Sequence, residues 1–304
     1  MFPVISIPDD ARESLEQLGT KEKFWLRIGD QRHLFKMGRM GTGENWAEKI
    51  AAELADLLGL PHASYDLAVW REKMGVLSPR FVPDDGRLIL GNELLAAIHT
   101  GYPQREIRQV RDHTLGRIHA LLTKLVIGHP PGWASPDRRI VSAYDLFLGY
   151  LLLDAWIANQ DRHHENWGLI SHQQNIYLAP SYDHAASMGQ NETDQKRRAR
   201  LTTLDRGHHI SRYVTKARSA IYDSKSSKKP LLTLDLFRKA TEKSPGAAGI
   251  WLDKLRKIRQ DAVENCFDQL SEKEITPIGR QFALTMLKLN QRQLLEDPTP
   301  CLIP

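Results

Sequence analysis

Two aspartates and one asparagine in the middle of the chain have residue types and a spacing that suit phosphoryl transfer. Asp161 is followed five residues later by Asn166, and Asp183 lies seventeen residues beyond Asn166. One carboxylate could accept the proton of an attacking hydroxyl, while the asparagine oxygen and the second carboxylate hold magnesium against the phosphates of a nucleotide. The alternative for an Asp and an Asn at this spacing is a solvated turn in which they cap backbone groups.

A lysine in an apolar strand is a second candidate for chemistry. Lys36 lies in the otherwise apolar stretch His33–Met37, where a charged side chain is uncommon unless it is paired or has a function. Glu48 follows twelve residues later on the next expected helix, where it could pair with Lys36 and aim the ammonium at nucleotide phosphates. Glu44 or Glu53 could take the same role. The alternative is a lysine that reaches solvent from the end of its strand.

Two glycine-containing turns could contact phosphates. Gly19–Lys23 precedes the first long strand, and its glycine permits close backbone approach while Lys21 and Lys23 add positive charge. Gly41 and Gly43 precede the helix that carries Glu48, so they could form an anion-binding helix N-terminus, with an ordinary turn as the alternative.

The elements that must position these residues fall into a β-rich part and a helical part. Within residues 1–90 we expect a hairpin, one helix stopped by Gly59 and two further strands: Phe24–Ile28, His33–Met37, Glu44–Leu58, Ser64–Trp70 and Gly75–Val82. The pattern predicts an α+β protein whose small first lobe is followed by a larger helical lobe over residues 91–304.

In the second part, Asp161 and Asn166 fall on a loop between a helix and a hairpin. Hydrophobic periodicity and capping residues predict helices at Glu93–Ile98, Thr114–Ile127, Ser142–Asn159, Leu231–Glu242, Gly249–Leu270 and Pro277–Leu295, and short strands at Trp167–Ile170 and Ile176–Leu178. A rigid helix therefore precedes the chemical motif, with Ser142 as its N-cap.

Composition sets modest limits on the kind of protein. The chain has 304 residues, of which 41% are hydrophobic and 26% are charged, as in ordinary soluble globular proteins. Its longest apolar run, Leu146–Ala158, is interrupted by Asp154 and is too short to span a bilayer. We expect no membrane span, and a cytoplasmic location by default. Cys266 and Cys301 have no zinc-site or disulfide spacing.

The positive charge of the chain is concentrated in one segment. Residues 194–229 hold eleven Lys or Arg against three Asp or Glu, a net charge of +8, whereas the whole chain has +5. The segment has no clean periodicity, and Lys225–Lys229 within it is expected to be an exposed loop or a disordered stretch. The whole segment could attract acidic partners or be only a solvated, mobile loop. Direct nucleic-acid binding is not expected, because Tyr213 and Tyr222 are its only aromatic residues.

Five stretches, taken together, resemble one known family, the HipA-like serine/threonine kinases. They are Gly19-Thr-Lys-Glu-Lys23 before a strand, Leu34-Phe-Lys36, the helix end Glu53-Leu-Ala-Asp-Leu-Leu-Gly-Leu-Pro61, Ala158-Asn-Gln-Asp-Arg-His163 with Asn166, and Leu178-Ala-Pro-Ser-Tyr-Asp183. Each stretch is weakly specific alone, and the combination is specific over roughly Gly19 to Gly189.

The resemblance implies a bilobal fold like that of protein kinases, with ATP and Mg²⁺ between the lobes. It implies that Asp161 is the catalytic base, that Asn166 and Asp183 hold magnesium, and that Lys36, supported by Glu48, binds phosphate. It further implies that a loop at the start of the kinase region covers the phosphates, that the inter-lobe hinge contacts adenine, and that a histidine organises the catalytic loop. The corresponding residues are Gly19, Thr20, Lys21, Lys23, Arg80, Phe81, Val82 and His163.

The resemblance also bears on partners. The acceptor would be a serine or threonine of a cellular protein, the chain would act as a toxin or effector able to autophosphorylate, and an antitoxin could be its partner. Thr20 and Ser14 are the hydroxyls nearest the glycine loop. Because the chain reaches that loop almost at once, it resembles a short, stand-alone type of the family. Secretion as an effector stays open beside a cytoplasmic location.

Two other functions remain open at this stage. A phosphoinositide or other small-molecule kinase would use the same Asp, Asn and Asp. A non-catalytic module could instead bind acidic partners through residues 194–229.

Overall fold

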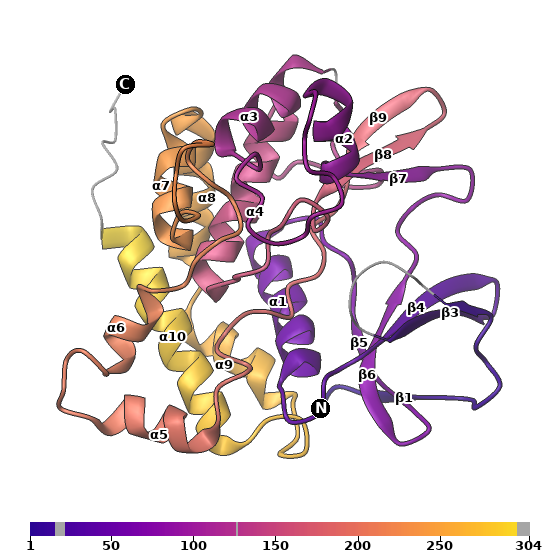
Figure 1. Cartoon of the computed structure of the whole chain (residues 1–304). Helices are drawn as coiled ribbons and strands as arrows, with labels where there is room; N and C mark the ends of the chain where they lie inside the picture. Colours follow the sequence, from indigo (N-terminus) through magenta and orange to yellow (C-terminus); the bar gives the residue numbers. More distant parts are fainter. Residues whose placement is uncertain (16–21, 126, 297–304) are drawn as a thin grey trace.

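The chain folds into a β-sheet lobe and a helical lobe (Figure 1). The computed structural model describes residues 1–15, 22–125 and 127–296, so Gly19, Thr20 and Lys21 lie outside the described residues. The first lobe is built on a six-stranded sheet with the order β1-β5-β6-β4-β3-β2. Its strands are β1 (Val4–Ile7), β2 (Ser14–Leu15), β3 (Lys23–Ile28), β4 (Gln31–Met37), β5 (Asp66–Trp70) and β6 (Lys73–Pro79).

The β3–β4 hairpin separates an apolar face from a face that carries lysines. Phe24 and Phe35 are directly paired across the two strands, and both are buried in a small core with Trp70. Side chains alternate along a strand, so the next pair, Lys23 and Lys36, points to the opposite face. The predicted hairpin is confirmed, and its register places two lysines side by side.

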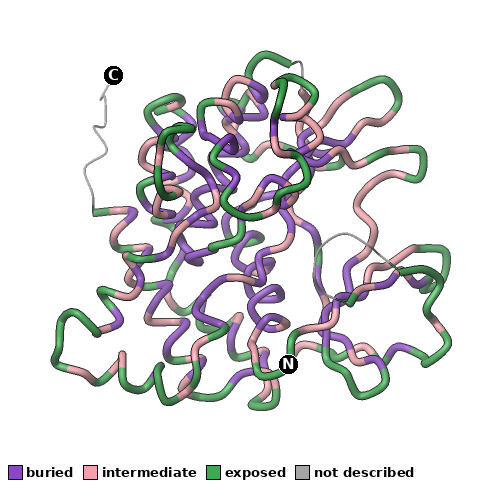
Figure 2. Tube along the Cα trace, in the orientation of Figure 1, coloured by how far each residue is buried: buried purple, intermediate pink, exposed green. Residues whose placement is uncertain are grey.

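Helix α1 (Glu44–Leu58) joins the two lobes. Its bounds are those that the sequence predicts, and it ends at Gly59, whose φ of 71° is the left-handed conformation that glycine adopts without strain. The buried residues of α1 belong to the same continuous core as those of α4. Figures 1 and 2 show α1 between the sheet and the helical lobe, in a mainly buried stretch. The position of Glu48 therefore depends on both lobes.

Helix α4 (Ala143–Ile157) is the central element of the helical lobe. Almost every one of its residues is buried, which agrees with its nearly uninterrupted apolar sequence. The predicted N-cap Ser142 is confirmed, since its side chain accepts a hydrogen bond from the Asp145 N–H at 3.1 Å. The helices around α4 are α2 (Gly91–Ile98), α3 (Leu115–Lys124), α5 (Asp194–Thr202), α6 (Ile210–Val214), α7 (Thr233–Thr241), α8 (Pro245–Lys257), α9 (Gln260–Asp268) and α10 (Pro277–Glu296).

A second sheet lies at the junction of the lobes. Strand β7 (Arg87–Leu90) pairs with β8 (Gly168–His172), which pairs with β9 (Asn175–Leu178). The segment Asp161–Asn166 therefore lies between α4 and β8, as expected. Among the described residues, no helix is long and apolar enough to cross a membrane.

The structure corrects two expectations. The segment 194–229 is not a loop throughout: Thr193 caps α5, Arg197 on that helix is buried, and α6 follows. The expected helix 249–270 is two helices, α8 and α9, separated at Ile258 and Arg259, which have extended backbone conformations.

Candidate active site

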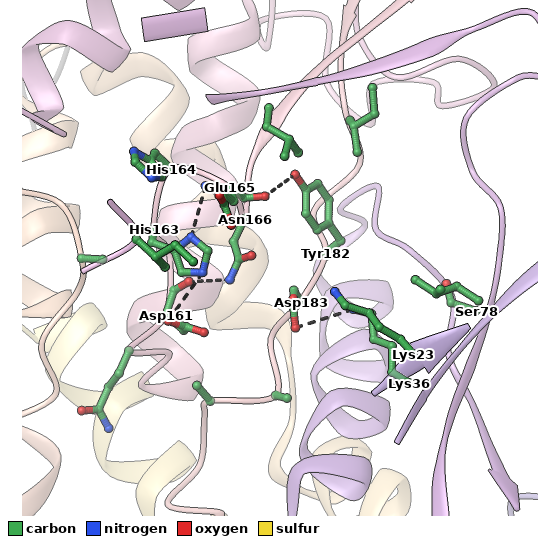
Figure 3. Close-up of a pocket in the computed structure, with 18 of the residues that line it drawn as sticks. Lys23, Lys36, Ser78, Asp161, His163, His164, Glu165, Asn166, Tyr182 and Asp183 are labelled. Carbon is green, nitrogen blue, oxygen red and sulfur yellow. Dashed lines mark hydrogen bonds and ion pairs between the residues drawn. The ribbon is translucent and has the colours of Figure 1, made fainter. Parts of the chain in front are cut away.

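A cavity of about 1220 Å³ lies between the lobes and collects most of the predicted site residues. Its lining includes Lys23, Lys36, Arg80, Phe81, Val82, Asp161, His163, Asn166 and Asp183. Glu48 is absent from this lining and is only 1% exposed. Residues predicted from stretches far apart in the sequence thus face one space (Figure 3).

Lys36 is a buried cation that faces a carboxylate. Its Nζ lies 3.6 Å from Oδ1 of Asp183 and donates a hydrogen bond of 3.4 Å to the hydroxyl of Tyr65. Burial opposes the charge, but the carboxylates of Asp183 and Glu48 outweigh it and raise the pKa of Lys36 above its ordinary value. Lys36 is therefore a permanent cation in a site shielded from bulk water.

Lys23 stands directly opposite Lys36 on the neighbouring strand. Directly opposed residues of antiparallel strands have Cβ atoms about 5 Å apart, and like charges at such positions destabilise a sheet. Both lysines line the cavity, and Figure 3 shows them beside Asp183. Two adjacent cations at the wall of a cavity favour a polyanionic ligand.

Glu48 connects the part of the site around Lys36 to the segment after Asp183. Its Oε1 accepts a hydrogen bond of 2.6 Å from the backbone N–H of His184. Its charge also raises the pKa of Lys36, although Asp183 has the larger effect. The predicted role of Glu48 as a support for Lys36 is compatible with this arrangement, and Glu48 additionally fixes the backbone next to Asp183.

The loop that carries Asp161 begins where α4 ends. Ala158 closes the helix with a φ of 54°, and the Asn159 side chain accepts a hydrogen bond of 3.1 Å from the Asp161 N–H. The side chain of Asp161 is 55% exposed, so a substrate hydroxyl can reach it. This carboxylate has the access that a general base needs.

The Asn166 side chain is oriented by the backbone of Asp161. Its Nδ2 donates a hydrogen bond of 2.7 Å to the backbone carbonyl of Asp161. The donor end of the amide is thereby fixed, and Oδ1 accepts no hydrogen bond from the described residues. An oriented amide oxygen is a suitable ligand for a hard cation.

His163 lies within the loop and helps to shape it. Its Nδ1 accepts a hydrogen bond of 3.2 Å from the Glu165 N–H, and its Nε2 lies 3.9 Å from Oδ1 of Asp161. This geometry suits the predicted role of loop organiser. Among the described residues, no group of three His, Cys, Asp or Glu could hold an ion.

Asp183 has an uncommon backbone conformation. Its φ is 60°, and its N–H donates a hydrogen bond of 3.2 Å to Tyr65, the residue that also contacts Lys36. A non-glycine residue in this region persists only when its surroundings determine it, and such residues concentrate at functional sites. Tyr65 and Glu48 together hold the turn that carries the Asp183 carboxylate.

The expected hinge residues Arg80, Phe81 and Val82 line the cavity. The Phe81 ring stacks on that of Tyr182 with centroids 5.7 Å apart, and Tyr182 donates a hydrogen bond of 2.8 Å to the Glu165 carbonyl. Arg80 forms an ion pair with Asp84, with 3.2 Å between the guanidinium nitrogen and Oδ1. Phe81 and Val82 thus supply an apolar wall, whereas Arg80 is engaged in a local ion pair.

Arg162 organises the loop, and the sequence analysis assigned it no role. It is 1% exposed, forms a two-pronged pair with Asp154 of α4 at 2.7 and 2.8 Å, and donates to the Asn166 carbonyl at 2.7 Å. It also donates to Ser181 Oγ at 3.0 Å. The buried Arg162 side chain therefore connects the backbone of Asn166, one expected metal ligand, to Ser181. Ser181 lies two residues before Asp183, the other expected ligand.

The network continues from Ser181 to Glu48. Ser181 Oγ lies 2.7 Å from Nε2 of His184, whose pKa burial and the Arg162 charge hold well below its usual range. A neutral His184 that accepts the Ser181 proton carries its own hydrogen on Nδ1, which lies 3.7 Å from Glu48 Oε1. The chain of contacts runs from α4 through the site to α1.

Two further histidines under the loop were not foreseen. Burial lowers the pKa of His113 to about 3 and that of His164 to about 4. Trp167 donates to His113 Nε2 at 3.0 Å, so His113 carries its hydrogen on Nδ1, which faces the Ala220 carbonyl at 3.2 Å. These rings are neutral packing elements. Their sequence positions give no hint of this, because their partners lie more than fifty residues away.

Comparison with known proteins identifies the family. The profile described as HipA-like C-terminal domain matches residues 17–231, more than half of the chain. The chain belongs to the HipA-like family. No curated protein sequence matches it.

Two solved structures share the fold. The Helicobacter pylori proinflammatory kinase CtkA is similar with a TM-score of 0.71 and 17% identity, over 97% of this chain and 99% of that one. HipA of Shewanella oneidensis MR-1, solved with HipB and operator DNA, is similar with a TM-score of 0.56 and 15% identity, over 96% of this chain and 68% of that one. The β-sheet and helical lobes thus form the kinase-like fold that the sequence predicts.

Proposed function

We propose that the protein is an ATP- and magnesium-dependent kinase that phosphorylates serine or threonine side chains of a protein. The observation that supports this most is the convergence of Lys36, Asp161 and Asp183 on one cavity between the lobes. The family and the kinase-like fold agree with it. A binding module without catalysis would have no need of this arrangement.

The chain has residues suited to each part of the ligand. Lys23 and Lys36 would hold the phosphates, Asn166 Oδ1 and the Asp183 carboxylate would hold magnesium, and Phe81 and Val82 would pack on the base. Two protein ligands are enough for magnesium, which usually keeps several waters and binds through the phosphates as well. ATP supplies the phosphoryl group that is transferred, and magnesium neutralises charge on its oxygens.

Within this arrangement the residues of the chain divide the work. Asp161, whose carboxylate is exposed to the cavity, would accept the proton of the acceptor hydroxyl. His163 and Asn166 fix the loop that presents it. Lys36 remains charged throughout, because Asp183 and Glu48 raise its pKa. Its contribution is positioning and electrostatic stabilisation.

The biological setting is part of the proposal. HipA of S. oneidensis was solved together with HipB of a toxin–antitoxin system. For this chain we propose a toxin or effector role, an antitoxin-type protein as a candidate partner and the ability to autophosphorylate.

A transfer assay with labelled ATP tests the function. The purified chain is incubated with γ-labelled ATP and magnesium, alone and with separated protein and lipid fractions, beside an Asp161→Asn variant that keeps the size of the side chain. We expect label on the chain itself or on proteins, and at least about a hundredfold less with the variant. Label on lipids alone would assign a small-molecule kinase, and equal labelling by the variant would refute the role of Asp161.

A further inference from the structure

The cavity continues beyond the residues assigned to the nucleotide. Pockets for one small molecule measure roughly 300–1,000 Å³, whereas this cavity has about 1220 Å³. Its additional lining comes from two loops of the helical lobe, which contribute Arg105, Ile107, Arg108, Gln109, Val110, Ser219, Ala220, Tyr222 and Pro230. The same space thus has room for a second molecule next to Asp161.

These two loops form one structured wall. Thr114 and Tyr222 pair as an isolated parallel bridge. The Tyr222 N–H donates to the His113 carbonyl at 2.9 Å, and the Leu115 N–H donates to the Tyr222 carbonyl at 3.0 Å. His113 also faces the Ala220 carbonyl and packs in parallel with Trp167, which directly follows Asn166. The wall is therefore tied to the catalytic loop.

The wall carries positive charge that the protein leaves unpaired. Arg105 and Arg108 are exposed and form no ion pair or hydrogen bond with another described residue, and the same holds for Lys228 and Lys229 beside Pro230. We name residues 105–111 and 218–230 the cationic wall. Residues 105–111 hold three arginines against one glutamate, Glu106.

Other charges at the cavity and near the wall already have partners. Arg39 pairs with Glu44 at 2.7 Å and Arg87 with Glu93 at 2.5 Å. Of the acids in or beside the cationic wall, Glu106 is exposed and forms no ion pair with another described residue, whereas Asp112 and Asp223 have partners. Asp112 pairs with Arg117 at 2.6 Å and with Lys225 at 3.3 Å, and Asp223 pairs with Lys239 at 2.6 Å. Two unpaired arginines and two unpaired lysines therefore face one unpaired acid among these described residues, and this excess of positive charge makes the wall complementary to an anion.

We propose that the cationic wall binds the phosphate acceptor, a protein segment with carboxylate or phosphate groups close to the serine or threonine that is modified. This inference rests on the proposed kinase function and adds a substrate class to it. Charge complementarity across an exposed surface contributes mainly to specificity and to the rate of association. The preference should therefore weaken as salt rises.

Paired peptides with a single serine measure this preference. One peptide carries three glutamates around the serine, and the other carries glutamines, which have the same shape without charge. For the wild type we expect kcat/KM to be about threefold to tenfold higher for the glutamate peptide, as exposed ion pairs allow. A third peptide carries lysines at the same three positions. With the Arg105→Glu/Arg108→Glu variant, this lysine peptide should become preferred over the glutamate peptide.

A charge-matched control separates local from global effects. Lys273 and Lys288 are exposed, and neither lines the cavity. The Lys273→Glu/Lys288→Glu variant changes net charge equally and should keep the glutamate preference. A preference reversal in the first variant alone supports the proposal.

Three results would overturn it. Transfer that ignores peptide charge in the wild type, or a preference unchanged in the arginine variant, refutes the cationic wall while leaving the kinase function intact. If the arginine variant loses only the binding of an oligothymidylate, the surface reads nucleic acid instead. If no labelling of peptide or protein is observed that disappears in the Asp161→Asn variant, the kinase function itself fails, and this inference fails with it.

Discussion

Arginines behind the cavity lining and within it are used in opposite ways. We call the position of Arg162, which is buried and does not line the cavity, the floor, and that of Arg105 and Arg108, which are exposed and line it, the rim. Arg162, at the floor, is 1% exposed and contacts Asp154, Asn166 and Ser181. Arg105 and Arg108, at the rim, are exposed and contact no other described residue through an ion pair or hydrogen bond. The charge at the floor is therefore fully paired and fixes the geometry of the loop, whereas the charge at the rim is available to a partner.

Removing the arginine at the floor should have the largest effect on stability. Arg162→Ala leaves the Asp154 carboxylate buried without its cation, which costs about 3–5 kcal/mol in the free energy of unfolding. Urea denaturation measures this loss. The double variant Asp154→Leu/Arg162→Met leaves no buried charge and should recover much of it. A single variant within 1 kcal/mol of wild type would show that Arg162 does not organise the loop.

Lys36 should affect nucleotide use rather than folding. We expect Lys36→Ala to lower kcat/KM for ATP about a hundredfold, because a charged group that faces the phosphates is lost. Lys49 is a matched control, since it is also 8% exposed and pairs with Glu53 at 2.9 Å outside the cavity. Lys49→Ala should leave the KM for ATP unchanged. Normal turnover by Lys36→Ala at low ATP would move the phosphate role to Lys23.

The buried histidine that joins floor and rim should make stability depend on pH. Burial holds the pKa of His113 at about 3, below the unfolded value near 6.5. Between these values the unfolded chain binds more protons, so stability is complete above pH 6.5 and falls as pH decreases toward 3. From pH 7 to pH 5 the contribution of His113 is about 2 kcal/mol.

Urea denaturation at pH 7 and pH 5 checks this contribution. The His113→Gln variant should lose about 2 kcal/mol less between these pH values than the wild type does. His208, whose side chain is 79% exposed, serves as control, and His208→Gln should behave like the wild type. If the free energies of unfolding of His113→Gln and the wild type depend on pH in the same way, the pKa of His113 is not lowered by burial. His113 would then not be the buried link between floor and rim.

The smallest effect on stability is expected at the rim. Arg105→Ala removes an exposed side chain without an internal ion pair, so the free energy of unfolding should stay within about 0.5 kcal/mol of wild type. The same urea experiment compares it directly with Arg162→Ala. A loss above 2 kcal/mol would mean that Arg105 supports the fold, and the distinction between floor and rim would then disappear.

Local patterns were enough to predict the β3–β4 hairpin and α1 of the first lobe. The β3–β4 hairpin has turn residues Gly29 and Asp30 between two apolar runs, and α1 has an apolar stripe that ends at Gly59. These features depend on residues close together in the sequence. Strand β1 was not predicted, because its partner β5 lies about sixty residues away.

The polar helix α5 could not be predicted in the same way. Its one buried residue is Arg197, which donates to the carbonyls of Gly189 and Gln190 at 3.2 and 3.1 Å and pairs with Asp194 at 2.8 Å. A helix held by an arginine instead of an apolar stripe has no hydrophobic periodicity to detect.

The candidate site shows the same division. Asp161, Asn166 and Asp183 lie on short motifs, so their presence in one cavity could be anticipated. Asp154 gave a weaker indication, because a charge inside the apolar helix α4 requires a buried partner. That partner, Arg162, became evident only when the end of the helix and the loop were placed together.

The magnesium dependence of ATP turnover in the wild type and in Asp183→Ala distinguishes a kinase active site from a cavity that only binds. Asp183 combines a left-handed backbone, a contact of 3.6 Å with Lys36 and a place in the cavity wall. We predict that the wild type hydrolyses or transfers the terminal phosphate of ATP only with magnesium, and that Asp183→Ala does neither at any magnesium concentration. Unchanged turnover by a folded Asp183→Ala variant would contradict the assignment of this cavity as a kinase active site.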